Sequence, residues 1–188
     1  MTSSTCEILE DRGLLLASDP VLPSVAALVA GAPVNGSWWS HPKGREIFRV
    51  LRELEDDADV AFVKLVAGKV TLVHRRLWSA LYAAAASREA WQLENLSAAA
   101  KSLLSRVEKE GRLAPGKADS KAARELEARL LVLSAEVHTE TGAHVRVLES
   151  WKSWAKRVKL AKVSLSAAAG KGRLEEALGK ASGMLPWR

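Results

Sequence analysis

The sequence has a single cysteine and no long apolar run. With Cys6 alone, no disulfide framework can form within the chain. The longest apolar stretch, residues 21–34, is interrupted by Pro23, Gly31 and Pro33 and is too short to cross a bilayer. The first residues are polar and then acidic, which is not the pattern of a secretory signal. We therefore expect a cytoplasmic protein that does not associate with a membrane.

The positive charge is concentrated near the C-terminus. Apolar residues make up 48% of the chain and charged residues 27%, which is typical of a folded globular protein. Residues 151–188 contain nine Lys and Arg against Glu175 and Glu176, a net charge of +7, so residues 1–150 carry −1 of the total of +6. A neutral body with a basic arm is typical of a protein that binds a polyanion such as nucleic acid. The alternative is a solvated basic tail.

The first half of the chain predicts helices and a hairpin. Residues 41–56 carry apolar side chains at helical spacing, with arginines along another face. Residues 60–74 alternate as two strands around Ala67-Gly68, and pairing Leu65 with Val70 matches Val63 with Leu72. A further helix is expected near residues 23–30.

The second half predicts three helices, at residues 77–86, 97–111 and 119–130, followed by a hairpin over residues 131–149. Ser97 is a good N-cap for the second of these helices, and Gly111 ends it. In the hairpin, pairing Val137 with Val145 also pairs Ala135 with Val147 and leaves residues 140–142 as a three-residue loop. A slip of one residue would place apolar side chains opposite polar ones, so the register is well specified.

A basic helix is expected from Trp151 onward. It would place Trp151 and Trp154 on one face and its lysines on another, either solvated or aimed at phosphates. Seven tryptophans stand beside only two phenylalanines and one tyrosine. We expect Trp78 and Trp151 in the core, and Trp38-Trp39 and Trp187 docking the ends of the chain onto the body.

The helices and hairpin of the second half resemble winged-helix DNA-binding proteins. The resemblance lies in residues 97–149, with "SAAAKSLLSRVEKEGRL" and "ARELEARLLVLSAEVHTETGAH". "SWWSHPKGREIF" and "VHRRLW" resemble an uncharacterised bacterial family. The fold class predicted is mainly α with two β-hairpins (α+β), as tandem winged-helix-like units plus a basic C-terminal helix. The domains are expected at residues 1–75, 76–150 and 151–188.

Tandem winged helices are also similar to the bacterial alkyl-DNA glycosylases built from such repeats. That family uses a Gln-x-Asp or Gln-x-Gln pair, whereas the closest string here is Gln92-Leu93-Glu94. The resemblance therefore implies DNA binding, and a DNA-repair enzyme of the glycosylase type is the alternative to a non-catalytic protein. A protein-interaction module is the third hypothesis.

Two histidine arrangements offer further chemistry. The predicted register sets His138 opposite His144, where both could share a metal with Glu136 or Glu140, although such side chains on an exposed hairpin are more often solvated. His41 and His74 could form an active site with an acid, but their spacing does not require one. The string "AAAGKGR" at residues 167–173 lacks the upstream glycine of a phosphate-binding loop. We predict no catalytic residues, no metal and no cofactor.

Non-catalytic binding of double-stranded DNA, in a transcriptional or nucleoid-associated role, is the function that the sequence favours. Recognition helices are expected at residues 119–130 and 41–56, with wings at 131–149 and 60–74 and lysines of the C-terminal helix on phosphates. The predicted DNA-binding residues are Arg45, Arg49, Arg52, Lys64, Lys69, Lys121, Arg124, Arg146, Lys152, Lys156 and Lys159.

Overall fold

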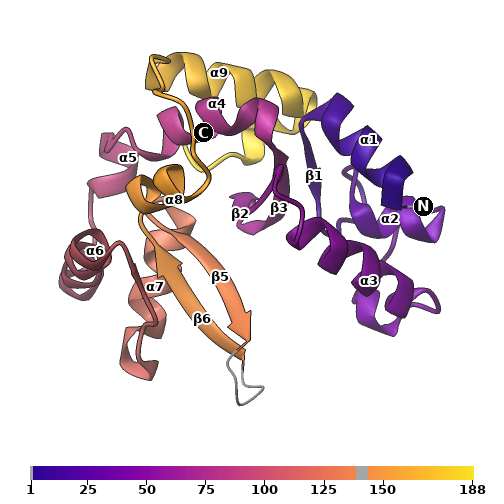
Figure 1. Cartoon of the computed structure of the whole chain (residues 1–188), viewed down its shortest axis with the longest axis horizontal. Helices are drawn as coiled ribbons and strands as arrows, with labels where there is room; N and C mark the ends of the chain where they lie inside the picture. The colour runs from indigo at the N-terminus through magenta and orange to yellow at the C-terminus, as the bar shows by residue number, and fades with distance from the viewer. Residues whose placement is uncertain (1, 139–143) are drawn as a thin grey trace. The chain divides into compact units, whose positions relative to one another are not determined.

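The chain divides into two units in the computed structural model, which describes residues 2–138 and 144–188. Unit 1 contains residues 1–78, 172–186 and 188, and unit 2 contains residues 79–171 and 187. Residues 151–171 thus group with unit 2 and residues 172–186 with unit 1. Figure 1 labels the elements of both units.

Unit 1 is built on a three-stranded antiparallel sheet with the strand order β1-β3-β2. Its elements are α1 (Thr2–Arg12), β1 (Leu14–Leu16), α2 (Val25–Ala30), η1 (Trp38–Ser40), α3 (Gly44–Glu55), β2 (Val60–Val66), β3 (Lys69–His74) and η2 (Arg75–Leu77), with η4 (Gly179–Met184) joining them from the C-terminal part. The predicted helices and hairpin are present, and α1 and β1 add to them. The core packs α2 and α3 against the sheet through Val25, Val29, Ile47, Val50, Leu54 and Leu72.

The predicted register of the first hairpin is wrong by one residue over most of its length. Val63 pairs with Thr71, and Phe62 pairs with Leu72, because a bulge between Lys64 and Val66 shifts the ladder. The bulge lets the consecutive residues Leu65 and Val66 both be buried, which strict alternation cannot do. Thr71 is fully buried there, and its hydroxyl accepts the amide of Val66 at 3.3 Å.

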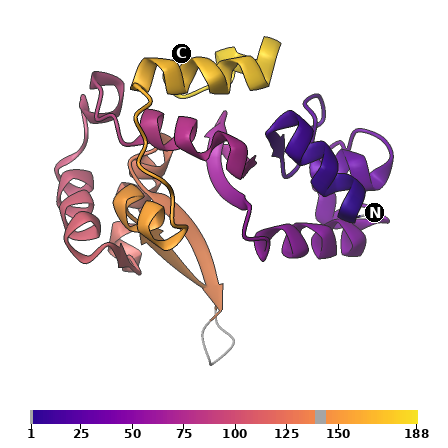
Figure 2. The same ribbon diagram turned by 45° about the horizontal axis from the view of Figure 1, so that its top comes forward.

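Unit 2 contains a second sheet of the same form, with the strand order β4-β6-β5. Its elements are α4 (Trp78–Ala85), which begins at the boundary, α5 (Ala90–Leu93), α6 (Ala98–Glu110), β4 (Arg112–Leu113), η3 (Lys117–Asp119), α7 (Ser120–Ala128), β5 (Leu133–His138), β6 (His144–Glu149) and α8 (Trp151–Arg157). Helix α9 (Ala167–Leu178) crosses from unit 2 into unit 1 along the chain. Figures 1 and 2 show α8 at the base of the hairpin, where β6 ends.

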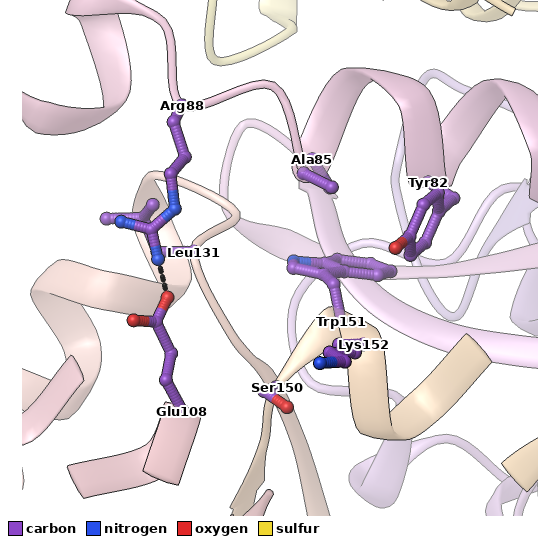
Figure 3. Close-up of a pocket in the computed structure, with 9 residues that line it drawn as sticks. Tyr82, Ala85, Arg88, Glu108, Leu131, Ser150, Trp151 and Lys152 are labelled. Carbon is purple, nitrogen blue, oxygen red and sulfur yellow. Dashed lines mark ion pairs between the residues drawn. The ribbon is translucent and has the colours of Figure 1, made fainter. Parts of the chain in front are cut away.

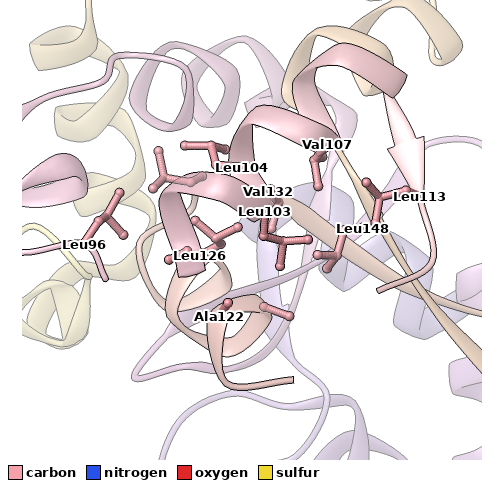
Figure 4. Packing of buried hydrophobic residues seen from close by; sticks show 12 residues of the cluster. Leu96, Leu103, Leu104, Val107, Leu113, Ala122, Leu126, Val132 and Leu148 are labelled. Atoms are coloured by element: carbon pink, nitrogen blue, oxygen red, sulfur yellow. The ribbon is translucent and has the colours of Figure 1, made fainter. Parts of the chain in front are cut away.

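The register of the second hairpin is as predicted. Val137 pairs with Val145, Ala135 with Val147 and His138 with His144. The expected loop at residues 140–142 lies outside the described residues. Helices α6 and α7 pack on this sheet through a cluster of apolar side chains (Figure 4), made of Leu96, Ala100, Leu103, Leu104, Val107, Leu113, Ala122, Ala123, Leu126, Leu131, Val132 and Leu148. Ser97 caps α6 as expected, accepting the amide of Ala100 at 3.1 Å.

The single basic helix predicted from Trp151 is wrong, because α8 ends at Arg157. Lys159 adopts a left-handed conformation with φ of 52°, and the amide of Leu160 donates to the carbonyl of Ala155 at 2.9 Å. This is a Schellman motif, which closes a helix by satisfying its last carbonyls. Trp151 is nevertheless in the core, as predicted, and so is Trp78, each with 4% of its surface exposed.

The fold class is α+β, mainly helical with two small antiparallel sheets among the described residues, as the sequence predicts. Each predicted hairpin gains a third strand, β1 or β4, that comes from earlier in the chain. No helix in the described part of the chain is long and apolar enough to span a membrane.

Candidate nucleic-acid interface

Helix α7 of unit 2 presents one face to the core and another to solvent. Ala122, Ala123 and Leu126 are buried against α6 and the sheet, at the helical spacing seen in the sequence. Lys121 and Arg124, one turn apart, are exposed on the other side. Neither has an ion-pair partner among the described residues.

The carboxylates of α7 are engaged inside the unit. Glu125 accepts hydrogen bonds from the amide of Ser97 at 2.9 Å and from its hydroxyl at 2.7 Å, and these bonds lower the pKa of that carboxyl. Glu127 is buried and forms an ion pair with Arg146 of β6. The helix therefore uses its acids to hold α6 and the hairpin, and leaves its cations facing outward.

Helix α3 of unit 1 carries its charges differently. Arg45, Arg49 and Arg52 lie along its surface, but Arg49 pairs with Glu53 at 3.2 Å and Arg52 with Glu55 at 2.5 Å. Both acids lie on the same helix as the arginines. Acids of α3 itself therefore neutralise two of the three arginines in the cationic stripe predicted for this helix. The two exposed cations of α7 have no such ion pairs in the described residues.

The whole-chain charge divides unevenly between the units. Unit 2 contains sixteen Lys and Arg against ten Asp and Glu, a net charge of +6, whereas unit 1 contains twelve of each and has no net charge. The sequence alone assigns the excess to the C-terminal arm. In the folded protein, the whole net charge of +6 belongs to unit 2, the unit that contains α7.

The remaining predicted cations have mixed surroundings. Lys69 forms an ion pair with Asp19 at 2.6 Å, in a loop where Asp19 also accepts the amides of Val21 and Leu22. Lys64 is half-buried on β2. Arg146, a predicted DNA-binding residue on the hairpin, forms an ion pair with Glu127 on α7.

Around α8, three lysines are exposed and one arginine forms an ion pair inside the unit. Lys152 and Lys156 are exposed one turn apart on this helix, and Lys159 is exposed just past its end. Arg157 instead donates hydrogen bonds from two nitrogens to the buried carboxylate of Glu149, at 3.0 and 2.7 Å. These bonds raise the pKa of the Arg157 guanidinium. The three predicted lysines are therefore available to a ligand, although they do not share one helix.

Three aromatic side chains of unit 1 form a cluster that the sequence did not predict. Trp38 and Trp39 stack with centroids 3.9 Å apart, and Phe48 on α3 lies 5.3 Å from Trp39. Trp39 is 63% exposed and Phe48 45% exposed. The position of Phe48 between Arg45 and Arg49 at helical spacing is the sequence signal that could have identified it. Trp187, predicted to dock the end of the chain, lies 5.8 Å from Trp91.

Gln92, the residue that the resemblance to glycosylases singles out, is completely buried. Its amide nitrogen donates to the carbonyls of Ala85 at 2.8 Å and Arg129 at 3.2 Å, and its oxygen accepts the amide of Glu89 at 3.2 Å. The side chain therefore fastens the end of α4 and the start of α5 to the residue that follows α7. It has no surface through which to contact a substrate.

The histidines do not form a metal site within the described residues, where no group of three His, Cys, Asp or Glu side chains is arranged to hold an ion. The side chains of His138 and His144 lie outside the described part. His41 accepts the amide of Lys43 at 3.1 Å, which fixes the turn before α3. His74 has a buried Nδ1 without a hydrogen-bond partner in the described residues.

No protein-family model matches the sequence, and no curated protein or solved structure shows a significant match to the chain.

Proposed function

We propose that the protein binds double-stranded DNA without catalysis, mainly through unit 2 with α7 in the major groove. The observation that carries the proposal is the sorting of charge on α7. Its carboxylates bind Ser97 and Arg146 inside the unit, and Lys121 and Arg124 face solvent and form no ion pair in the described residues, although the charge of Lys121 also acts on Glu125. An exposed helix face with uncompensated cations attracts phosphates and can donate hydrogen bonds to base edges.

The order of the elements supports the same proposal. Each unit has a helix, a short strand, a 3-10 or short α segment, a second main helix and then two strands. In each sheet the first strand pairs with the third. This order is consistent with two winged-helix-like units, in which α7 would be a recognition helix and β5 with β6 its wing.

Unit 2 also has the charge that a polyanion requires. Its net +6 provides a sequence-independent attraction, to which Lys152, Lys156 and Lys159 contribute. Unit 1 has no net charge and pairs most of its α3 arginines, so we assign it the smaller part in duplex binding.

Fluorescence anisotropy with a labelled duplex tests the role of α7. The variant K121Q/R124Q is compared with R45Q/R49Q, which removes the same two charges from α3. We expect the α7 variant to bind more weakly and to lower the slope of log K against log salt by about 2, because each phosphate contact releases about 0.9 of a counterion. The α3 variant should change both quantities much less. Equal weakening by the two variants would mean that only total charge matters.

The lysines around α8 make a separate prediction. Changing Lys152, Lys156 and Lys159 to Gln should weaken binding to every duplex alike and lower the same slope by roughly 2 to 3. Contacts from α7 to bases should instead change the preference between sequences, by about 1 to 3 kcal/mol for each good base contact. Absence of duplex binding by the parent protein would remove the proposal. Release of bases from alkylated DNA would favour the glycosylase alternative.

A protein-interaction role for unit 1 is the second candidate, and the exposed Trp39 and Phe48 favour it. Large apolar side chains grouped on a surface without net charge suit an apolar partner better than a phosphate backbone. A second copy of the chain is the partner to test first. Sedimentation that shows self-association, lost in W39A, would support this role, and a monomer at all concentrations would count against it.

A further inference from the structure

Unit 2 contains a pocket of about 350 Å³ near the base of its hairpin, and none of its lining residues belongs to α7. It is formed by the second half of α4 and the turn after it, one side chain of α6, one residue of the segment between α7 and β5, and the start of α8. The lining residues are Tyr82, Ala85, Ala86, Arg88, Glu108, Leu131, Ser150, Trp151 and Lys152. Its volume is at the small end of the range in which proteins hold small molecules.

One side of the pocket is aromatic and apolar. Figure 3 shows Tyr82, Ala85 and Trp151 grouped there. The indole of Trp151 is fixed from behind, because its nitrogen donates to the carbonyl of Leu130 at 2.6 Å and its ring meets Trp154 edge to face, with centroids 5.4 Å apart. The Tyr82 hydroxyl has no hydrogen-bond partner among the described residues. A flat apolar group can therefore pack on this side with a hydrogen-bond donor beside it.

Strained backbone holds two parts of the pocket. Arg88 has φ of 54° and Leu130 has φ of 51°, in the left-handed region where glycine or asparagine is usual. Leu130 closes α7 in a Schellman motif, and its carbonyl is the one that positions Trp151.

The charge of the pocket is positive. Arg88 forms an ion pair with Glu108 on the side opposite the aromatic group (Figure 3). This pair leaves the ammonium of Lys152, which is exposed, as the uncompensated charge in the lining. A ligand that packs on the aromatic side and also pairs with the ammonium of Lys152 must combine a flat apolar body with an anionic group.

We propose that this pocket binds a small aromatic carboxylate. The ring packs against Trp151 and Tyr82, and the carboxylate meets Lys152 and accepts a hydrogen bond from the Tyr82 hydroxyl. The site shares no residue with the DNA contacts of α7, whereas Lys152 is also one of the proposed phosphate contacts around α8. The proposal does not depend on either set of DNA contacts.

Benzoate is the probe for a titration of the isotope-labelled full-length chain, followed by the NMR resonance of the Trp151 indole N–H. Benzyl alcohol supplies the ring without the charge, and acetate the charge without the ring. Ionic strength is kept constant with chloride. We expect a saturable shift with benzoate, and binding at least tenfold weaker with each of the other two compounds.

A matched pair of variants on α8 tests the role of the ammonium. Lys152 lines the pocket and Lys156, one turn later and also exposed, does not. K152Q should weaken benzoate binding about tenfold, the factor that corresponds to a loss of about 1.4 kcal/mol, whereas K156Q should leave it unchanged. Both side chains are exposed, so neither change should impair folding.

Three results would overturn the proposal. They are an unchanged Trp151 resonance at millimolar benzoate, equal binding of benzyl alcohol or acetate, and equal weakening by K152Q and K156Q. Because no DNA is present in the titration, its outcome is independent of whether the protein binds a duplex.

Discussion

Replacing Gln92 with methionine tests whether this side chain is structural. Methionine has a similar size and is apolar, so the change removes hydrogen bonds without opening a cavity. The carbonyls of Ala85 and Arg129 and the amide of Glu89 lose their side-chain partner at this fully buried position. A buried group left without a partner costs about 1 to 3 kcal/mol, and a typical net hydrogen bond is worth about 1 kcal/mol.

Q92M leaves one well-buried carbonyl and two partly buried groups without their side-chain partner, so we expect it to lower the free energy of unfolding of the chain by about 3 kcal/mol. For a chain of this size that corresponds to a decrease in Tm of roughly 6 to 12 °C. Thermal unfolding followed by circular dichroism measures it. Urea unfolding should show a lower midpoint with an unchanged slope.

The neighbouring residue in the same string provides the control. Glu94 is exposed, and E94Q should change the stability by no more than about 0.5 kcal/mol. A Q92M protein that melts at the temperature of the parent would refute the structural assignment. It would also restore Gln92 as a candidate for contact with a substrate.

Two further substitutions test packing and electrostatics. On α9, a Cβ added at Gly170 would lie 2.6 Å from the carbonyl oxygen of Ala80, so G170A should destabilise the protein by about 1 to 3 kcal/mol. A Cβ added at Gly172 meets no atom within 4 Å, so G172A should be neutral or stabilising. Equal Tm values for the two variants would contradict this packing. The hydrogen bonds from Ser97 lower the pKa of Glu125, so they stabilise the fold above the ordinary pKa near 4.5, and this stability is lost as the pH falls through the lower pKa of the folded state. S97A removes the hydroxyl bond and keeps the backbone amide bond, so it should raise the pKa of Glu125 and make the acid-induced decrease in Tm shallower, and an unchanged carboxyl titration by NMR would show that the hydroxyl bond is not made.

Local periodicity in the sequence was sufficient for several elements. The alternation of apolar and polar residues gives the second hairpin a single register, and the structure has that register. Ser97 and Gly111 mark the ends of α6, because capping depends on residues adjacent to the helix. The apolar spacing of α3 and α7 likewise identifies their buried faces.

Elements that depend on distant partners could not be predicted in this way. Strand β1 is only three residues long and exists because it pairs with β3, more than 50 residues later. The bulge at Leu65 shifts the first hairpin because Val66 and Thr71 are both buried by the rest of unit 1. The C-terminal helix is interrupted at Lys159 by a Schellman motif without a glycine to mark it.

The charges of the candidate interface depend partly on local sequence and partly on distant partners. Sequence by itself determined that the chain is basic, and that Lys121 and Arg124 lie on one face of a helix, because net charge and helical spacing are local properties. Only the tertiary structure decided what the acids of α7 contact. Ser97 and Arg146 come from other elements of unit 2 and occupy the acids of α7, while the acids of α3 stay on its own surface beside Arg49 and Arg52. The pairs on α3 join residues four and three positions apart on one helix, which the sequence spacing already allows, whereas Ser97 and Arg146 lie far along the chain from the acids of α7 and only folding brings them together.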